Sequence, residues 1–263
     1  MTSARSFGAA QTVPRRGDVA ANVAEHLRLI DTAAREQVRT LVFPELSLTG
    51  YELELAAALA FVDEDPRLTP LRARATSHRM TLIVGAPVRL DARLHIGAFI
   101  VRPDDTLGLY TKHHLGSFSP EANPGGLVPP GEPTIFHPGD RDPLVDLGDS
   151  VAAIAVCADT GHTEHPRRAA DRGATAYLAS MFFTPAEVDK ESARLAGYAT
   201  HHRMTVVAAN YGGPTGDLAS GGGSAIWSPT GAPLVQLGPR GAGLAVAVAD
   251  ETGWRARAVM LET

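Results

Sequence analysis

The stretch that decides the fold is Ser150-Val-Ala-Ala-Ile-Ala-Val-Cys157-Ala-Asp159, an apolar run that ends in the only cysteine of the chain. Such a run predicts a buried strand over Val151–Val156, and a polar turn then leads into a predicted helix over Glu164–Arg172. In α/β proteins, the carboxyl ends of strands are where ligands bind and chemistry occurs. A lone cysteine can form neither an internal disulfide nor a thiolate metal site. Cys157 is therefore either a small buried side chain or a nucleophile.

Length and composition favour one globular domain. The chain has 263 residues, of which 44% are hydrophobic and 20% charged, and we find no repeat or compositional boundary, so we expect a single domain over residues 1–263. The net charge of −5 gives no reason to expect nucleic acid or an anionic membrane as a partner. No stretch approaches the ~20 apolar residues of a membrane span. The N-terminus lacks the apolar stretch of a signal peptide, and an unpaired cysteine suits a reducing compartment, so we expect a cytoplasmic protein.

Strands and helices are predicted to alternate along the chain, which indicates a layered α/β fold with two sheets between helices. A Gly- and Pro-rich segment over residues 116–133 is predicted to be a long loop, of a length that usually indicates function. The predicted helices cover residues 18–37, 66–80, 164–172 and 185–203. The predicted strands cover residues 7–11, 39–43, 81–86, 95–102, 106–110, 151–156, 174–179, 205–210, 224–228, 233–237 and 244–250.

Three apolar segments each end in one residue that can react or ionise: Glu45 after Leu-Val-Phe-Pro, Lys112 after Leu-Tyr-Thr, and Cys157 after Ile-Ala-Val. Gathered at adjacent strand ends, these side chains would form a nucleophilic site. The carboxylate would take the thiol proton as a general base, and the lysine would stabilise the thiolate and then an oxyanion. Taken singly, each residue also has a structural interpretation, such as a helix cap, a solvated hairpin end or a buried thiol.

The three segments together resemble the nitrilase superfamily, the carbon–nitrogen hydrolases. Phe43-Pro-Glu-Leu-Ser-Leu-Thr-Gly-Tyr51 is similar to the block that carries the general base of that family. Tyr110-Thr-Lys-His-His-Leu115 is similar to its lysine block, and Cys157-Ala-Asp159 followed by Glu164 is similar to its nucleophile block. Further matches, at Gln11, Gly17-Asp18, Asn22, Asn210 and Gly223–Gly231, extend the resemblance over nearly the whole chain.

The resemblance implies a four-layer α-β-β-α sandwich with a Glu45–Lys112–Cys157 triad. It also implies a second glutamate on the loop after the lysine, for which Glu121 is the match, to orient Lys112 or to position the substrate amine and water. In the implied mechanism Cys157 attacks an amide carbonyl, Lys112 and the backbone N–H of Ala158 stabilise the oxyanion, and water releases the acid from a thioester. The implied chemistry needs no metal or organic cofactor, and the family association implies a homodimer or higher homo-oligomer.

Several positions depart from the family pattern and put the substrate in doubt while leaving the triad intact. Ala158 stands where an aromatic residue is common, Gly161-His-Thr163 replaces Arg-Phe-Pro, and Tyr198–His202 replaces Arg-Ala-x-Glu-Asn. Met181 and Phe182 follow the strand after the nucleophile helix and either form a wall of the acyl pocket or belong to the core.

The sequence favours a hydrolase of linear amides and leaves three alternatives open. A nitrilase would use the same triad on a small nitrile, through a thioimidate. An amide-forming or acyl-transferring member would resolve the thioester with an amine. A catalytically silent ligand-binding protein on the same fold has no reason to keep Glu45, Lys112 and Cys157, and an unreactive Cys157 would distinguish it.

Overall fold

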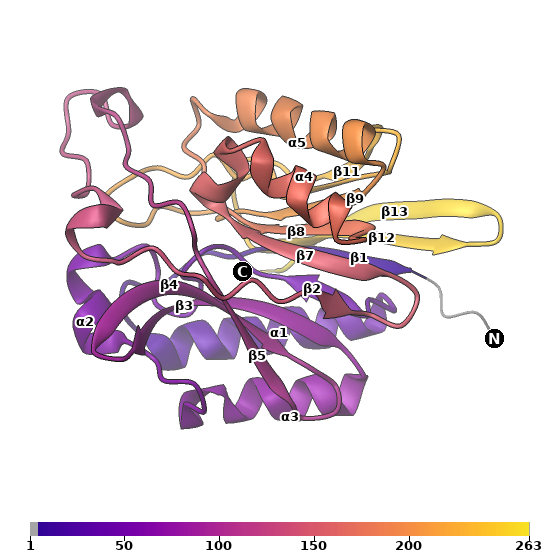
Figure 1. The fold of residues 1–263 in the computed structure, drawn as a ribbon, viewed down its shortest axis with the longest axis horizontal. Helices are drawn as coiled ribbons and strands as arrows, with labels where there is room; N and C mark the ends of the chain where they lie inside the picture. Colours follow the sequence, from indigo (N-terminus) through magenta and orange to yellow (C-terminus); the bar gives the residue numbers. More distant parts are fainter. Residues whose placement is uncertain (1–4, 263) are drawn as a thin grey trace.

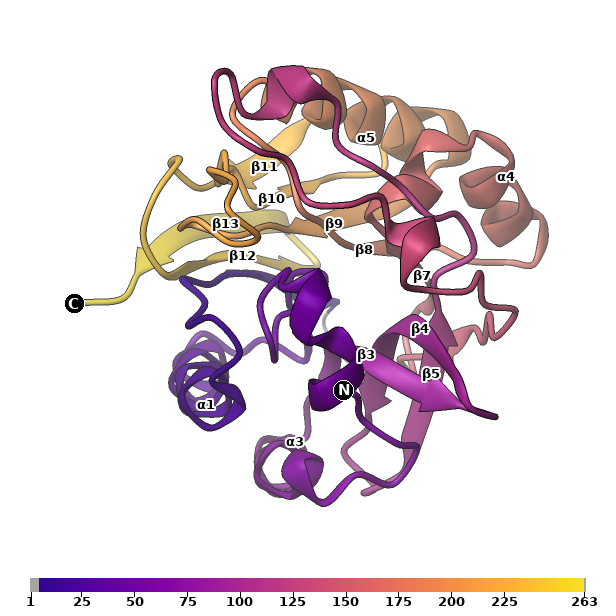
Figure 2. The same cartoon turned by 90° about the vertical axis from the view of Figure 1, so that its left-hand side faces the viewer.

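Two β-sheets lie face to face, and each is covered on its outer face by helices, in a computed structural model that describes residues 5–262. Figure 2 shows the layers edge-on, with α1 (Val19–Arg35) and α3 (Thr69–His78) below the sheets and α4 (Glu164–Asp171) and α5 (Val188–His202) above them. A four-residue helix, α2 (Ala56–Leu59), lies beside the first sheet. The expected four-layer α-β-β-α architecture is therefore confirmed.

The first sheet has seven strands in the order β13-β12-β1-β2-β3-β4-β5. Its centre is parallel (β1, β2 and β3), and the strands toward both edges are antiparallel. The bounds are β1 (Ser6–Gln11), β2 (Thr40–Val42), β3 (Thr81–Leu90), β4 (Arg93–Val101), β5 (Leu107–Thr111), β12 (Gly243–Asp250) and β13 (Gly253–Met260).

The second sheet has six strands in the order β11-β10-β9-β8-β7-β6, again with a parallel centre of β7, β8 and β9. Parallel centres place the carboxyl ends of neighbouring strands at one edge of each sheet, which is where the chemistry of α/β proteins lies. The bounds are β6 (Val145–Asp146), β7 (Val151–Val156), β8 (Ala176–Ser180), β9 (Thr205–Ala209), β10 (Ala225–Trp227) and β11 (Pro233–Gln236).

Strand β7 shows how the sequence specifies these layers. Its side chains alternate between the two faces of the sheet, as the pleat requires. Ile154 and Val156 pack into the core between the sheets, whereas Ala153 and Ala155 face the helical layer of α4 and α5. The strand is thus buried on both faces, which explains why it appears in the sequence as a continuous apolar run.

Most of the predicted elements agree with the structure to within a few residues, but three are new: α2, β6 and β13. Strand β13 escaped prediction because it is an edge strand in which arginines alternate with alanines, and most of its side chains are exposed. It pairs with β12 in a long hairpin that projects from the body of the molecule (Figure 1). Within residues 5–262, every helix is too short or too polar to cross a membrane.

Candidate active site

The three residues singled out at strand ends lie at one place between the sheets. Glu45 follows β2 and Lys112 follows β5, both in the seven-stranded sheet, while Cys157 follows β7 in the six-stranded sheet. Lys112 Nζ donates a hydrogen bond to Glu45 Oε1 over 2.6 Å. The Cys157 thiol is near enough to Glu45 for the charge of that carboxylate to raise the pKa of the thiol. The two sheets thus supply the site jointly.

Glu45 is held in a tight turn whose backbone is fixed by contacts from both sheets. Its N–H donates to Met181 O over 3.4 Å, and the Tyr211 hydroxyl donates to its carbonyl oxygen. Gly85 of β3 lies directly against this turn, where a Cβ would come within 2.4 Å of Leu46 N. Only glycine allows so close an approach of the two backbones. The turn therefore aims the carboxylate rigidly.

Lys112 is fully buried and bridges two carboxylates. Its N–H continues the pairing of β5 with β4 by donating to Ile96 O over 2.9 Å, which carries the side chain inward. Its Nζ donates to Glu45 Oε1 and, over 2.8 Å, to Glu132 Oε1. A buried ammonium needs such partners to offset its lost hydration.

Glu132 is the second glutamate of the site. It begins a 3-10 turn, Glu132–Thr134, near the end of the long loop, and is 1% exposed. The Tyr51 hydroxyl donates to its Oε1 over 2.8 Å, and Gly116 N donates to its Oε2 over 2.7 Å. Glu132 N in turn donates to Gly116 O over 3.0 Å, so the loop is closed back on itself at the site.

The expectation that Glu121 orients Lys112 is corrected by this geometry, because Glu132 makes the contact. Glu121 lies in a separate 3-10 turn, Pro120–Ala122, and its side chain is exposed. Both are carboxylates on the same Gly- and Pro-rich loop, and the sequence gives no local signal that separates them. Only the packing of the loop onto Tyr51 and Lys112 selects Glu132.

Cys157 lies at a sharp bend between β7 and the 3-10 turn Cys157–Gly161. Its φ of +43° is in the left-handed region, which a residue with a side chain adopts only when its surroundings impose it. Thr160 Oγ1 donates to Cys157 O over 2.8 Å, and Sγ lies 3.6 Å from Phe182 O. Such backbone strain concentrates at functional sites, and here it turns the thiol out of the strand toward the cavity.

Asp159 joins the nucleophile turn to the lysine segment. Its Oδ1 accepts from the backbone N–H groups of His113 and His114 over 3.1 and 2.9 Å, and its Oδ2 accepts from Val156 N over 3.0 Å and from the Tyr110 hydroxyl over 2.7 Å. Burial raises the pKa of Asp159, but these bonds, above all that of the His114 ring, outweigh burial and lower it to about 2. Asp159 is therefore an ionised buried link between the two sheets.

Burial and the neighbouring charges shift the pKa values of Glu45, Lys112 and Cys157. Burial raises the pKa of Glu45 to about 7, although the Lys112 charge opposes the shift, and the Glu132 charge adds to it. Burial lowers the pKa of Lys112, but Glu45 and Glu132 outweigh it and raise the pKa above its ordinary value, so the amine stays protonated. Burial and the Glu45 charge raise the pKa of the Cys157 thiol well above its usual range. At neutral pH the site thus holds a thiol, and the Glu45 carboxyl can gain or lose a proton there.

A cavity of about 140 Å³ opens onto Cys157. The residues expected to bind substrate, Ala158, Met181 and Phe182, all line it. Tyr51 and Glu132 line it as well, together with Gly116, Ser117, Phe118, Gly161, Phe183, Glu187, Glu191 and Arg194. The volume suits a group of a few heavy atoms, since a cavity of about 150 Å³ accommodates benzene in another protein.

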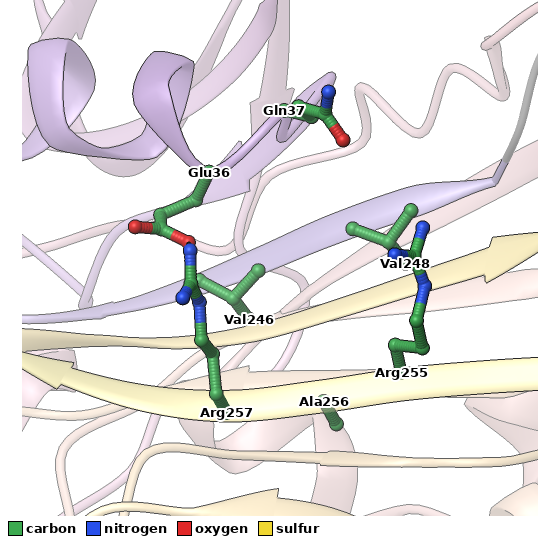
Figure 3. A pocket seen from close by; sticks show the side chains of 7 residues that line it. All are labelled: Glu36, Gln37, Val246, Val248, Arg255, Ala256 and Arg257. Atoms are coloured by element: carbon green, nitrogen blue, oxygen red, sulfur yellow. The ribbon is translucent and has the colours of Figure 1, made fainter.

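A second hollow, of 280 Å³, lies between the end of α1 and strands β12 and β13 (Figure 3). Arginines 255 and 257 of β13 face it, and Arg257 contacts Glu36. Although this hollow is larger, its lining contains no nucleophilic side chain. The cavity at Cys157 is therefore the candidate active site.

Comparisons with known proteins agree with this fold. The family model for carbon–nitrogen hydrolases matches residues 4–257, so the chain belongs to the carbon–nitrogen hydrolase family. The solved NitN amidase of Nesterenkonia sp. AN1 superposes with a TM-score of 0.78 at 26% identity, covering 92% of this chain and 91% of that one. A cysteine-to-alanine variant of that amidase, from the nitrilase superfamily, was solved in complex with butyramide and superposes with a TM-score of 0.78 at 25% identity.

The relatives found by sequence are matched over only part of their own length. The glutamine-dependent NAD(+) synthetase of Thermotoga maritima is 25% identical over 84% of this chain, which spans 38% of the length of that synthetase. A hydrolase encoded in the pqqF 5' region of Pseudomonas protegens is 28% identical over 87% of this chain and 77% of its own length. The chain thus spans little more than a third of the synthetases that it matches.

Proposed function

We propose that the protein hydrolyses a small linear amide through a thioester on Cys157. The observation that carries the proposal is the buried bridge of Lys112 between Glu45 and Glu132 beside a cavity lined by Cys157. This arrangement supplies a base, a fixed cation and a nucleophile at one point. The amidase solved with butyramide supports an amide of this size.

The reaction takes place in two stages. The Cys157 sulfur attacks the amide carbon while its proton passes to Glu45, and the resulting oxyanion is stabilised by the Lys112 ammonium and the Ala158 N–H. Glu45 then donates that proton to the nitrogen, the carbon–nitrogen bond breaks, and ammonia or an amine leaves. Water attacks the thioester, loses its proton to Glu45 and releases the acid, and the proton returns to the thiol.

Glu132 keeps Lys112 in place throughout these steps. Glu132 and Glu45 both accept hydrogen bonds from the same ammonium. When Glu45 is protonated, Glu132 therefore still holds the Lys112 ammonium in position. The Tyr51 hydroxyl, whose pKa is raised by burial and by the Glu132 charge, stays protonated and holds Glu132. A fixed cation beside the carbonyl stabilises the oxyanion without reorganisation during the reaction.

The test is ammonia release from a panel of short amides, carbamoyl compounds and nitriles, with Cys157→Ala as the matched control. Turnover of an amide that Cys157→Ala loses would support the proposal. Turnover of nitriles alone would replace it with nitrilase activity. A protein that turns over nothing and whose Cys157 resists alkylation would be a ligand-binding protein on this fold.

We also propose a homodimer or higher oligomer, which light scattering would test.

A further inference from the structure

His26 of α1 contacts the chain on both sides of Glu45, although it is not among the residues that line the active-site cavity. Its ring stacks on that of Phe43, two residues before Glu45, with the ring centroids 4.1 Å apart and the planes at 19°. Its Nε2 lies 2.9 Å from the Oγ of Ser47, two residues after Glu45. His26 is 1% exposed, so both contacts are made away from water. The helical layer outside the first sheet thus reaches the turn that carries Glu45.

The hydrogen bonds of His26 determine which ring nitrogen carries the proton. Asn22 O can only accept, so Nδ1, which lies 2.7 Å from it, is the N–H nitrogen. Burial lowers the pKa of His26 to about 4, so the ring is neutral at pH 7 and its Nε2 is an acceptor. The Ser47 hydroxyl therefore donates to Nε2, and its oxygen accepts from Gly85 N over 3.3 Å. Ser47 is thereby bonded to α1 on one side and to β3 on the other.

Helix α1 is also anchored to this turn at Asn22. Its Nδ2 donates to Leu48 O over 3.1 Å and to Arg15 O over 2.9 Å. Its Oδ1 accepts from Arg15 N over 2.7 Å. Because Asn22 and His26 are four residues apart, they lie on one face of α1 and contact the turn together. The His26 ring is therefore held in a fixed place against the turn.

The turn needs support from outside because it contains a residue in a costly conformation. Leu46 lies between Glu45 and Ser47 and has a φ of +51°, in the left-handed region that a residue with a side chain adopts only when its surroundings impose it. Ser47 N closes the turn by donating to Pro44 O over 3.2 Å. Without the bond from Ser47 to His26, the turn would be free to relax, and the Glu45 carboxylate would move with it.

We propose that His26 is a positioning residue that holds the Glu45 carboxylate in place for proton transfer from Cys157. It acts through the turn, by stacking on Phe43 and by accepting the hydrogen bond of Ser47. A displacement of about 1 Å, caused by a change remote from the chemistry, can lower a rate about 100-fold. This inference rests on the proposed function, because Glu45 is the base of that reaction.

The test compares His26→Phe, Ser47→Ala and the double variant. His26→Phe keeps a flat ring and loses the hydrogen bond, and Ser47→Ala loses the same bond from its other end. We expect each single variant to lower kcat on the best amide about 10- to 100-fold with KM nearly unchanged. The double variant should lie within about twofold of the slower single variant, because both changes remove one interaction. Ser47→Ala removes a single oxygen and keeps the test decisive if His26→Phe does not fold.

Thr32→Val is the matched control. Thr32 is a buried polar residue of the same helix, and its hydroxyl donates within the helix, to Arg28 O, over 2.9 Å. Its replacement should leave kcat unchanged even if the stability in urea falls. A similar loss of kcat in Thr32→Val and in Ser47→Ala would mean that activity follows the packing of α1 in general, which overturns the inference.

A pH profile distinguishes positioning from support of the fold alone. In a looser turn water reaches Glu45, so its pKa should fall from about 7 toward the ordinary 4.5. The acid limb of kcat/KM should therefore move to lower pH in Ser47→Ala. If the stability of that variant falls while its acid limb and its kcat per titrated thiol stay as in the unmodified protein, His26 supports the fold only and the inference is overturned.

Alkylation of Cys157 by iodoacetamide separates this inference from the proposed function, because it requires no amide. Its rate should rise as Glu45 ionises, since the thiol passes its proton to that carboxylate. If no amide is hydrolysed but the inflection of the alkylation rate moves to lower pH in Ser47→Ala and not in Thr32→Val, the proposed function fails and the positioning stands. If amides are hydrolysed and both His26→Phe and Ser47→Ala leave kcat and the two pH profiles unchanged, the positioning is overturned and the hydrolase stands.

Discussion

Lys112 Nζ and Glu45 Oε1 are 2.6 Å apart although the residues are separated by 67 positions in the sequence, and both side chains are fully buried. The pair joins the end of β5 to the turn after β2, across the width of β3 and β4. Because the ammonium also bonds to Glu132, removal of the Lys112 charge would leave two carboxylates without a cation in a site away from water.

Lys112→Met should destabilise the protein strongly as well as abolish activity. It leaves Glu45 and Glu132 facing each other without a cation, and breaking a buried pair in this way costs about 3–5 kcal/mol. Urea denaturation at neutral pH measures the loss. The double variant Lys112→Met, Glu132→Gln should regain part of it, and equal stabilities of the single and double variants would contradict the argument.

The pH dependence of kcat/KM should have its acid limb near neutrality. Glu45 must be ionised to accept the thiol proton, and burial raises its pKa to about 7. The protonated fraction grows as the pH falls below that value, so kcat/KM should decrease about tenfold per pH unit there. An acid limb near the ordinary value of 4.5 would mean that another group acts as the base.

Glu45→Gln should separate thiol acidity from catalysis. The Glu45 charge is one of the groups that raise the pKa of Cys157, whereas Lys112 lowers it. Without that charge the thiol pKa should fall, which the ultraviolet absorbance of the thiolate measures, while amide turnover is lost with the base. A thiol pKa that rises in Glu45→Gln would refute it.

Glu132→Gln and Glu121→Gln form a matched pair on one loop. The first removes the charge that holds Lys112, and we expect kcat to fall by about 10- to 100-fold, the range for a lost charged hydrogen bond. The second changes an exposed carboxylate and should leave kcat within about twofold, as for most surface substitutions. Steady-state kinetics on the best amide measures both kcat values. A larger loss of kcat in Glu121→Gln than in Glu132→Gln would restore Glu121 to the site.

Asp159→Asn should act on the position of Cys157 relative to Lys112. The amide replaces one accepting oxygen with a donor that faces backbone N–H groups, so at least one of the bonds to Val156, His113 and His114 is lost. We expect kcat to fall with KM little changed, and the thiol pKa to shift because the lysine moves. A loss of stability without either change would assign Asp159 a structural role alone.

How much of this could be predicted from the sequence differs from residue to residue. The apolar runs before Glu45, Lys112 and Cys157 are local signals, and they located the strands correctly. The structure places Glu45 and Lys112 in contact, as expected of residues at neighbouring strand ends. The choice of Glu132 over Glu121 could not be predicted, because it depends on how an irregular loop folds onto Tyr51. Strand β13 was missed for a related reason, since an exposed edge strand lacks the apolar alternation that a buried face imposes.

Because the site is divided between two sheets, its activity should be sensitive to the distance between the sheets. Glu45 and Lys112 follow strands of one sheet and Cys157 a strand of the other, so the proposed proton transfer would depend on the packing of the apolar layer between the sheets. A slight parting of the sheets would separate nucleophile from base while each sheet kept its own hydrogen bonds. Heating or mild denaturant should therefore abolish the activity before the circular dichroism changes. A variant with smaller apolar side chains between the sheets should keep its secondary structure but lose its activity.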